Sequence, residues 1–168
     1  MTKLLLVRHG ETVDNVNQIM QGQTQGELTI NGIEQAEKLA EELAGEPIDA
    51  FVSSDLKRSV DTCLILAKPH ALPVVQTALL RERDWGGFTG RFIPDLKGET
   101  WPDDVESLPD LLARAQRFLD FIRSHYEGKT VLAVGHGIIN KAIQAAHLGK
   151  EMREIPRMTN AEVRLLDM

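Results

Sequence analysis

An uninterrupted aliphatic run near the N-terminus, Leu-Leu-Leu-Val over residues 4–7, ends in Arg8 and His9 and then meets Gly10. Apolar runs of this length that end at a turn residue are typical of a buried strand in a parallel sheet. In such a sheet, ligands bind at the carboxyl ends of the strands. The run therefore predicts that Arg8 and His9 leave the core at a ligand site. A surface Arg-His pair is the alternative.

The rest of the chain alternates short apolar runs with amphipathic stretches. Strands are predicted over residues 49–54, 73–75, 129–134 and 161–166, and helices over residues 33–44, 56–68, 107–128 and 138–148. This alternation favours an α/β fold, in which three α/β/α layers enclose a mostly parallel central sheet. At 168 residues, the chain is expected to form one domain, residues 1–168.

The composition limits the expected partners. A hydrophobic fraction of 42% and a charged fraction of 26% are those of an ordinary soluble protein. The net charge of −6 argues against a nucleic-acid partner, and no apolar run has the length of a membrane span. A single cysteine, Cys63, and no signal-type apolar region after Met1 favour a cytoplasmic location. The oligomeric state stays open.

The predicted strand over residues 129–134 resembles the first one, because it ends in Gly135-His136-Gly137. If the two strands are parallel, their carboxyl ends meet at one edge of the sheet. Strand spacing then brings His9 and His136 within about 10 Å of each other.

Arg58 falls in the first turn of the helix predicted over residues 56–68. The helix dipole disfavours a cation there by a few tenths of a kcal/mol. An anion bound at the helix start would reverse this preference, because free N–H groups and Arg58 would converge on it. An ion pair of Arg58 with Asp55 or Asp61 is the alternative.

Glu82 lies between Arg81 and Arg83, so a surface ion-pair cluster is one interpretation of it. In an extended segment, however, alternate side chains point in opposite directions, and the arginines then point away from Glu82. Residues 84–106 follow without clean periodicity and contain two tryptophans. A loop of this length is more typical of a lid or pocket wall than of disorder, and we expect it to be a short pocket-covering loop.

Two histidines, two arginines and a carboxyl group suit a dianionic ligand such as a phosphate ester. Arginines bind phosphate oxygens bidentately and stay charged. One neutral imidazole can attack phosphorus, and the other can donate to a developing equatorial oxygen. A carboxylic acid can protonate the leaving oxygen, which contributes about 10²–10⁴-fold.

Four segments, in order along the chain, resemble motifs of the histidine phosphatase superfamily, the family of cofactor-dependent phosphoglycerate mutases and their phosphatase relatives. They are Arg8-His9-Gly10-Glu11-Thr12, Ser53-Ser54-Asp55-Leu56-Lys57-Arg58, Leu80-Arg81-Glu82 and Gly135-His136-Gly137. Residues 28–36 are also similar to the family's segment at the first helix. The resemblance covers most of the chain and implies a phosphoglycerate mutase-like fold.

The resemblance also implies roles for single residues. His9 would be the nucleophile that forms a phosphohistidine, and Glu82 would donate a proton to the leaving group and then act as the base for water. The phosphoryl group would be held by Arg8, Asn15, Arg58, His136 and Gly137. No metal and no other cofactor are implied, because the arginines carry the positive charge.

Two segments depart from the family pattern. Gln23-Thr24-Gln25-Gly26 stands where many of the phosphatases have an acidic residue, and Phe88-Thr89-Gly90 stands where they often have Trp-Glu-Gly. Both border the substrate side, so they leave the specificity open, including any effect of Thr24 and Thr89.

The expected activity is that of a metal-independent histidine acid phosphatase acting on a small phosphorylated metabolite. Mutases of this family carry extra segments over the pocket, whereas this chain has only residues 84–106, so mutase-type transfer is the alternative. A zinc hydrolase using His9, His136 and Glu82 is a second alternative, which the flanking arginines disfavour. A non-catalytic phosphate-binding module on the same fold is a third.

Overall fold

The computed structural model describes all residues, 1–168, and contains one five-stranded sheet in the order β3-β2-β4-β1-β5. The strands are β1 (Lys3–Arg8), β2 (Ala50–Ser53), β3 (Val74–Gln76), β4 (Thr130–Gly135) and β5 (Val163–Asp167). Only β5 runs antiparallel to its neighbour, β1. The prediction of a mostly parallel sheet is confirmed.

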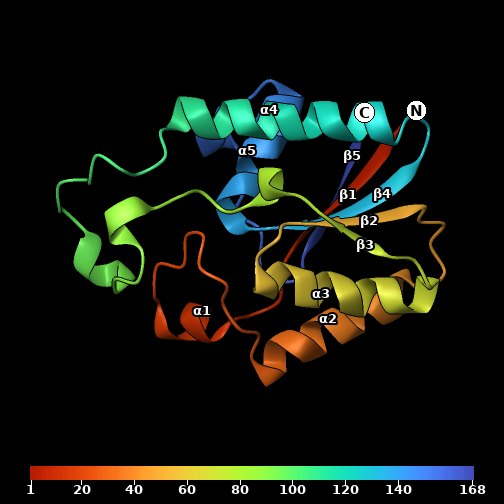
Figure 1. Cartoon of the computed structure of the whole chain (residues 1–168), viewed down its shortest axis with the longest axis horizontal. Helices are drawn as coiled ribbons and strands as arrows, with labels where there is room; N and C mark the ends of the chain where they lie inside the picture. The colour runs from red at the N-terminus through yellow and green to blue at the C-terminus, as the bar shows by residue number, and fades with distance from the viewer.

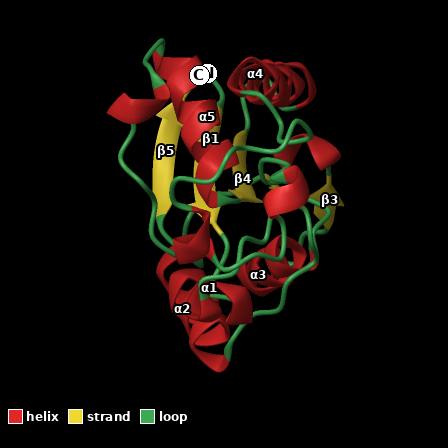
Figure 2. Ribbon diagram, turned by 90° about the vertical axis from the view of Figure 1, so that its left-hand side faces the viewer, coloured by secondary structure: helices red, strands yellow, loops and turns green.

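Helices cover both faces of this sheet (Figure 1). They are α1 (Val13–Asn17), α2 (Ile30–Leu43), α3 (Lys57–Ala67), α4 (Leu108–His125) and α5 (Gly137–Leu148). The strands lie between α4 and α5 on one side and α2 and α3 on the other, as Figure 2 shows from a second direction. The three-layer α/β/α prediction is therefore confirmed. No helix has both the length and the apolar character needed to span a membrane.

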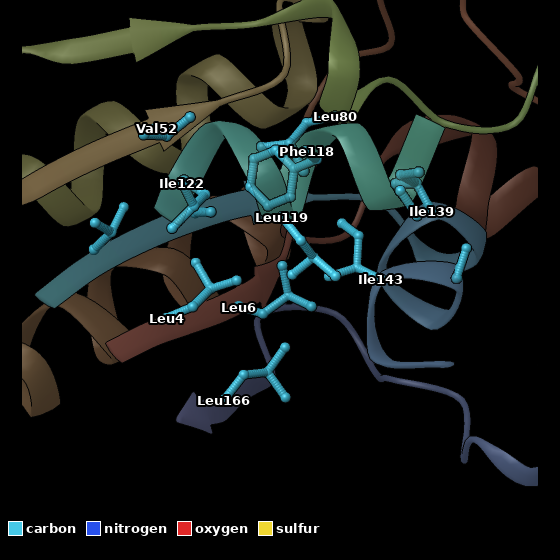
Figure 3. Close-up of a cluster of buried hydrophobic side chains, with 14 of the residues drawn as sticks. Leu4, Leu6, Val52, Leu80, Phe118, Leu119, Ile122, Ile139, Ile143 and Leu166 are labelled. Atoms are coloured by element: carbon cyan, nitrogen blue, oxygen red, sulfur yellow. The ribbon is translucent and has the colours of Figure 1, made fainter. Parts of the chain in front are cut away.

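Each face of the sheet has its own hydrophobic core, because successive side chains of a strand point to opposite faces. Leu4 and Leu6 of β1 belong to the cluster beneath α4 and α5, together with Phe118 and Ile143 (Figure 3). Val7 belongs to the second cluster, beneath α2 and α3. Since both faces of β1 are covered, its sequence is aliphatic throughout and shows no polar alternation.

The strand register places the ends of β1 and β4 side by side. Arg8 pairs with Gly135, and the backbone N–H of His9 donates to the Gly135 carbonyl at 3.2 Å. Because the two strands are parallel neighbours, the residues that follow them, His9 and His136, leave the sheet at the same edge.

Residues 84–106, green in Figure 1, extend beyond the sheet on the side away from the chain termini. They contain two short 3₁₀ turns, Gly86–Phe88 and Ile93–Leu96. Their backbone bonds to the loop after β1, since the N–H of Met20 donates to Arg91 O at 2.9 Å. Further 3₁₀ turns lie at Lys68–His70, Ala78–Leu80 and Met152–Glu154.

Candidate active site

A cavity of about 290 Å³ lies at the carboxyl ends of β1 and β4. Six of the seven residues that the sequence singles out line it, namely Arg8, His9, Asn15, Arg58, Glu82 and Gly137. The seventh, His136, is not among the lining residues, but its ring centroid lies 5.1 Å from that of His9, which does line the cavity. Residues far apart in the chain thus meet in one place.

His9 is held in one orientation at the end of β1. Its Nδ1 donates to the carbonyl of Gly10 at 2.7 Å, and its Nε2 has no protein partner. Burial lowers the pKa of His9 well below its ordinary value of 6.5, and the charges of Arg58 and Arg8 lower it further. The ring is therefore neutral near pH 7, with the Nε2 lone pair free to act as a nucleophile.

The turn after His9 is fixed by close contacts with two helices. The backbone N–H of Gly10 donates to Thr62 Oγ1 of α3 at 3.1 Å. A Cβ at Gly10 would lie 2.5 Å from the Gly32 carbonyl oxygen at the start of α2. The φ of Gly10 is not in the left-handed region, so the backbone conformation does not require glycine. Glycine is needed here because a Cβ would not fit.

His136 is fully buried, and two serines contact its ring. Its Nε2 lies 2.7 Å from Ser54 Oγ and 3.0 Å from Ser59 Oγ, whereas its Nδ1 has no partner. Burial, Arg58 and then His9 keep the pKa of His136 well below 6.5. Since the hydroxyls can donate to Nε2, the single proton of the neutral ring is available on Nδ1.

The two arginines are anchored by backbone carbonyls. Arg8 Nη1 donates to Met158 O at 2.8 Å, and Arg58 donates from Nη2 to Gly22 O at 2.8 Å and from Nη1 to Thr24 O. Burial lowers the pKa of Arg58 to about 10, so it stays charged near neutral pH. The Nε of each arginine has no partner.

The ion-pair alternative for Arg58 is wrong. Asp55 is bound by Arg81 in a two-bond contact, with Oδ2 2.6 Å from Nη2, and Asp61 is bound by Lys57 at 2.8 Å. Arg58 is 1% exposed, and no acidic side chain forms a salt bridge with it.

Three buried nitrogen donors around His9 therefore lack an acceptor: Arg8 Nε, Arg58 Nε and His136 Nδ1. A buried donor without a partner costs about 1–3 kcal/mol and is rare in native proteins. A tetrahedral oxyanion next to His9 Nε2 would give each of them an acceptor. Together they make this part of the cavity a candidate phosphate site.

Glu82 faces the start of α5. Its Oε2 accepts from the N–H of Ile138 at 3.0 Å, and its Oε1 accepts from Ile139 and Arg83 N–H groups at 2.9 Å. Arg81 binds Asp55 and Arg83 Nε donates to Glu106 O at 2.8 Å, and neither forms a salt bridge with Glu82, so the surface ion-pair interpretation of Glu82 is wrong.

The chain resembles known proteins along nearly its whole length. The family profile described as "Histidine phosphatase superfamily (branch 1)" matches residues 4–168. The chain belongs to the histidine phosphatase superfamily.

Three relatives illustrate the match. Phosphoserine phosphatase 1 of Hydrogenobacter thermophilus is 32% identical over 90% of this chain and 79% of its own. The metal-independent phosphoserine phosphatase of Arabidopsis thaliana is 34% identical over 89% of this chain and 72% of its own. The crystal structure of phosphoserine phosphatase from Entamoeba histolytica in complex with 3-phosphoglyceric acid superposes with a TM-score of 0.88 at 29% identity, covering 98% of this chain and 90% of that one. This chain is likewise a hydrolase of the histidine phosphatase type.

Asn15 contributes to this histidine phosphatase site from α1. Its Oδ1 accepts from the Thr12 N–H at 3.0 Å and from Asn160 Nδ2 at 3.3 Å, and Asn160 Nδ2 also lies 3.1 Å from His9 O. With its oxygen occupied, the Asn15 amide nitrogen remains as a donor for a ligand.

Sequence reasoning missed several residues of the site. Ser59 contacts His136, and Lys141 and Arg157 line the cavity. Lys141 lies five residues after His136 on the amphipathic stretch over residues 138–148, so helical spacing offered a weak signal for it. Arg157 lies in an irregular segment, and no local pattern marks it.

The zinc alternative lacks a ligand set in this histidine phosphatase. No three or more His, Cys, Asp or Glu side chains are grouped as metal ligands. His9 Nδ1 already donates to a carbonyl, and both oxygens of Glu82 accept backbone N–H groups.

Proposed function

We propose that this histidine phosphatase, as one domain of residues 1–168, hydrolyses small phosphomonoesters through a phosphohistidine on His9, with no metal or other cofactor. The observation that carries the proposal is the set of three unpartnered buried donors, from Arg8, Arg58 and His136, around a neutral His9 whose Nε2 is free. The phosphatase names of the relatives support it.

In the first step, the Nε2 lone pair of His9 attacks phosphorus, and the bond between phosphorus and the ester oxygen breaks. The guanidinium groups and His136 Nδ1 donate to the oxygens on which charge develops. Glu82 acts as the general acid and gives a proton to the leaving oxygen. The alcohol leaves, and the phosphoryl group stays on His9.

In the second step, Glu82 is a carboxylate and accepts a proton from water. The water oxygen attacks phosphorus, the P–N bond breaks, and inorganic phosphate leaves. His9 is then neutral again, and Glu82 carries a proton taken from the water, which replaces the one that left with the alcohol.

Hydrolysis is favoured over transfer to a second hydroxyl because water can reach the cavity. Residues 84–106 line it only through Trp85 and Ile93, so we propose that this loop covers one side of the pocket. Relatives named as probable phosphoglycerate mutases also match the chain. Their reaction would need the phosphoenzyme to be shielded from water, and a single short loop is a weak shield.

The charges of the cavity favour a substrate with a second anionic group. Arg8, Arg58, Lys141 and Arg157 line it, and Glu82 is the one acidic side chain among the lining residues, so at least three positive charges are in excess. A phosphomonoester neutralises about two of these. Neither Lys141 nor Arg157 has a salt-bridge or hydrogen-bond partner for its side chain, so both are available to a carboxylate. Phosphoserine and 3-phosphoglyceric acid, named with the relatives, carry one.

A substrate panel with the wild type, His9→Ala and Glu82→Gln tests the chemistry. We expect His9→Ala to abolish both turnover and an acid-labile phosphoenzyme trapped by rapid quenching. Glu82→Gln should lower kcat by about 10²–10⁴-fold for alkyl esters and far less for activated aryl esters. Turnover by His9→Ala equal to the wild type, or phosphate binding without turnover of any ester, would contradict the proposal and favour a phosphate-binding module.

Comparing 3-phosphoglycerate with glycerol 3-phosphate tests whether the site prefers a second anionic group. The first carries a carboxylate where the second carries a hydroxymethyl group. We expect the wild type to prefer 3-phosphoglycerate by about 10-fold or more in kcat/KM, the worth of one charged contact. Lys141→Gln and Arg157→Gln should reduce this preference. Lys150→Gln, at an exposed position two residues after the same helix ends, is the control and should retain it. Equal kcat/KM for both esters in the wild type would reject the carboxylate preference but not the phosphatase chemistry.

A further inference from the structure

Arg114 lies on the buried face of α4, flanked by the core residues Leu111 and Phe118, and is only 9% exposed. A guanidinium group in this position needs acceptors for its N–H groups, since burying a charge without partners is costly. All of its acceptors belong to Glu106 or to the segment that carries Glu82.

Three of these acceptors are backbone carbonyls beside the proposed acid. Arg114 Nη1 donates to Leu79 O at 3.0 Å and to Arg81 O at 2.6 Å, and Nη2 lies 3.3 Å from Glu82 O. Residues 81–83 lie outside any helix or strand, so no regular ladder supplies donors for their carbonyls. Besides Arg114, only Gln23 bonds to one of them, from Nε2 to Glu82 O at 3.2 Å. Because half-buried backbone carbonyls need partners, Arg114 takes the place of a regular hydrogen-bond ladder.

The other edge of the guanidinium is fixed by Glu106. Arg114 Nε donates to Oε2 at 3.0 Å and Nη2 donates to Oε1 at 2.8 Å, a two-bond contact with a defined plane. The two side chains are 11% and 14% exposed. Although burial raises the pKa of Glu106, hydrogen bonds from Arg114 and the Asp84 N–H outweigh it and lower that pKa. Glu106 is thus an ionised anchor for Arg114.

The backbone of the Glu82 segment is held from the core side as well. Leu80 is fully buried in the cluster that contains Phe118 and Leu119 of α4 (Figure 3). With Leu80 in the core and the carbonyls on Arg114, the side chain of Glu82 extends toward the cavity and the start of α5. Arg114 itself does not line the cavity.

We infer that Arg114 is a positioning residue for the proton transfer by Glu82, an inference that rests on the proposed function. Its planar guanidinium group is hydrogen-bonded to Glu106 and to three carbonyls. These bonds fix the position of the Glu82 carboxyl group relative to the leaving oxygen. Lysine could not replace it fully, because an ammonium group is a point donor without that plane. A displacement of about 1 Å in such a group is enough to cost about 100-fold in rate.

The test compares phenyl phosphate with p-nitrophenyl phosphate, two aryl esters whose leaving groups differ in how much they need a proton. We expect Arg114→Gln to lower kcat/KM for phenyl phosphate by about 10- to 100-fold, and for p-nitrophenyl phosphate by less than about threefold. Arg114→Lys should be intermediate. Arg117→Gln is the matched control, because Arg117 is exposed on the same helix, and it should stay within about twofold for both esters.

Glu82→Gln shows the selective loss on phenyl phosphate that is expected when the acid is absent. The double variant Glu82→Gln/Arg114→Gln completes a double-mutant cycle. If Arg114 acts through Glu82, the double variant should lose no more activity on phenyl phosphate than Glu82→Gln alone. Equal losses on both esters, or additive losses in the double variant, would overturn the inference and leave Arg114 as a structural residue only. Thermal unfolding is measured for every variant. If Arg114→Gln is unfolded at the assay temperature, Arg114→Lys replaces it, and its loss on phenyl phosphate is compared with its loss on p-nitrophenyl phosphate.

The failure of the proposed function has a different signature. If Glu82→Gln itself shows no selective loss on phenyl phosphate, Glu82 is not the acid, and the proposed function and this inference both fall. If Glu82→Gln shows the loss and the Arg114 variants do not, only the inference falls.

Discussion

In the proposed mechanism, His9 and His136 can carry the chemistry because burial and neighbouring cations keep them neutral. A protonated His9 would have no lone pair on Nε2, and a second charge between Arg8 and Arg58 would be repelled. The same surroundings that disfavour a charged ring attract a phosphate dianion. At the scale of single residues, reactivity and ligand affinity therefore have one electrostatic origin.

This burial makes stability depend on pH in a defined direction. The pKa values of His9 and His136 are lowered well below 6.5 in the folded chain, so the unfolded chain binds more protons below that pH. The free energy of unfolding should fall as the pH decreases from about 6.5 to 5.5, by up to about 1.4 kcal/mol per pH unit for each histidine. Urea denaturation at several pH values measures this slope.

Two variants separate these histidines from the others. His9→Gln should have a smaller pH slope than the wild type, whereas His125→Gln, at an exposed position of α4, should keep the wild-type slope. Identical slopes in His9→Gln and the wild type would show that His9 is protonated equally in both states. Carboxylates do not interfere, because they titrate mainly below this window.

At the scale of elements, the site depends on how closely the turn after β1 approaches α2. Gly32, in the first turn of α2, packs against the backbone of Glu11, and Gly10 packs against Gly32. The Thr29 hydroxyl accepts from the Gly32 N–H at 2.9 Å, which fixes the start of the helix at this contact. The turn that orients His9 is therefore held by the packing of one element on another.

Gly32→Ala should lower both stability and activity. A Cβ at this position would overlap the Glu11 carbonyl oxygen, which cannot move without shifting the backbone next to His9. We expect a loss of about 1–3 kcal/mol in the free energy of unfolding. Gly45→Ala, just after α2, is the control: nothing lies within 4 Å of its Cβ, and we expect a change of about 0.4–1 kcal/mol in the stabilising direction. Chemical denaturation and kcat/KM measure both effects, and a neutral Gly32→Ala would reject this account.

At the scale of the whole molecule, a chain with a net charge of −6 gathers four cations around one cavity. Such a cluster is unfavourable without a ligand, because like charges repel and buried donors lack acceptors. The folded state therefore gains more from anion binding than its net charge suggests.

Inorganic phosphate should stabilise the fold specifically. At a concentration of about 100 times its Kd, a ligand adds about 2.7 kcal/mol, which corresponds to a rise of about 5–10 °C in Tm for a chain of this size. Sodium chloride at equal ionic strength should not reproduce the rise. Arg58→Met, or Arg8→Gln if the former does not fold, should lose most of it. An equal rise in these variants would mean that phosphate binds elsewhere.

Much of the fold and site could be predicted from the sequence, because the relevant patterns are local. Aliphatic runs such as residues 4–7 identify strands, and a glycine after His9 or His136 marks where each strand gives way to the next segment, a turn after His9 and the start of α5 after His136. That both strand ends share one edge follows from parallel pairing alone. Pairing partners of charged groups could not be predicted: Arg58 and Asp55 are near in sequence, yet Asp55 binds Arg81.

The sequence by itself determined the α/β layers, the family motifs and the identity of the groups that would carry the chemistry. Only the tertiary structure decided that Glu82 faces the start of α5, that Lys141 and Arg157 line the cavity, and that Arg114 bonds to the Glu82 segment. The physical reason is the distance along the chain over which each effect acts. Periodicity and turn preference act within a few residues, whereas the acceptor of a buried donor is fixed by how distant segments pack.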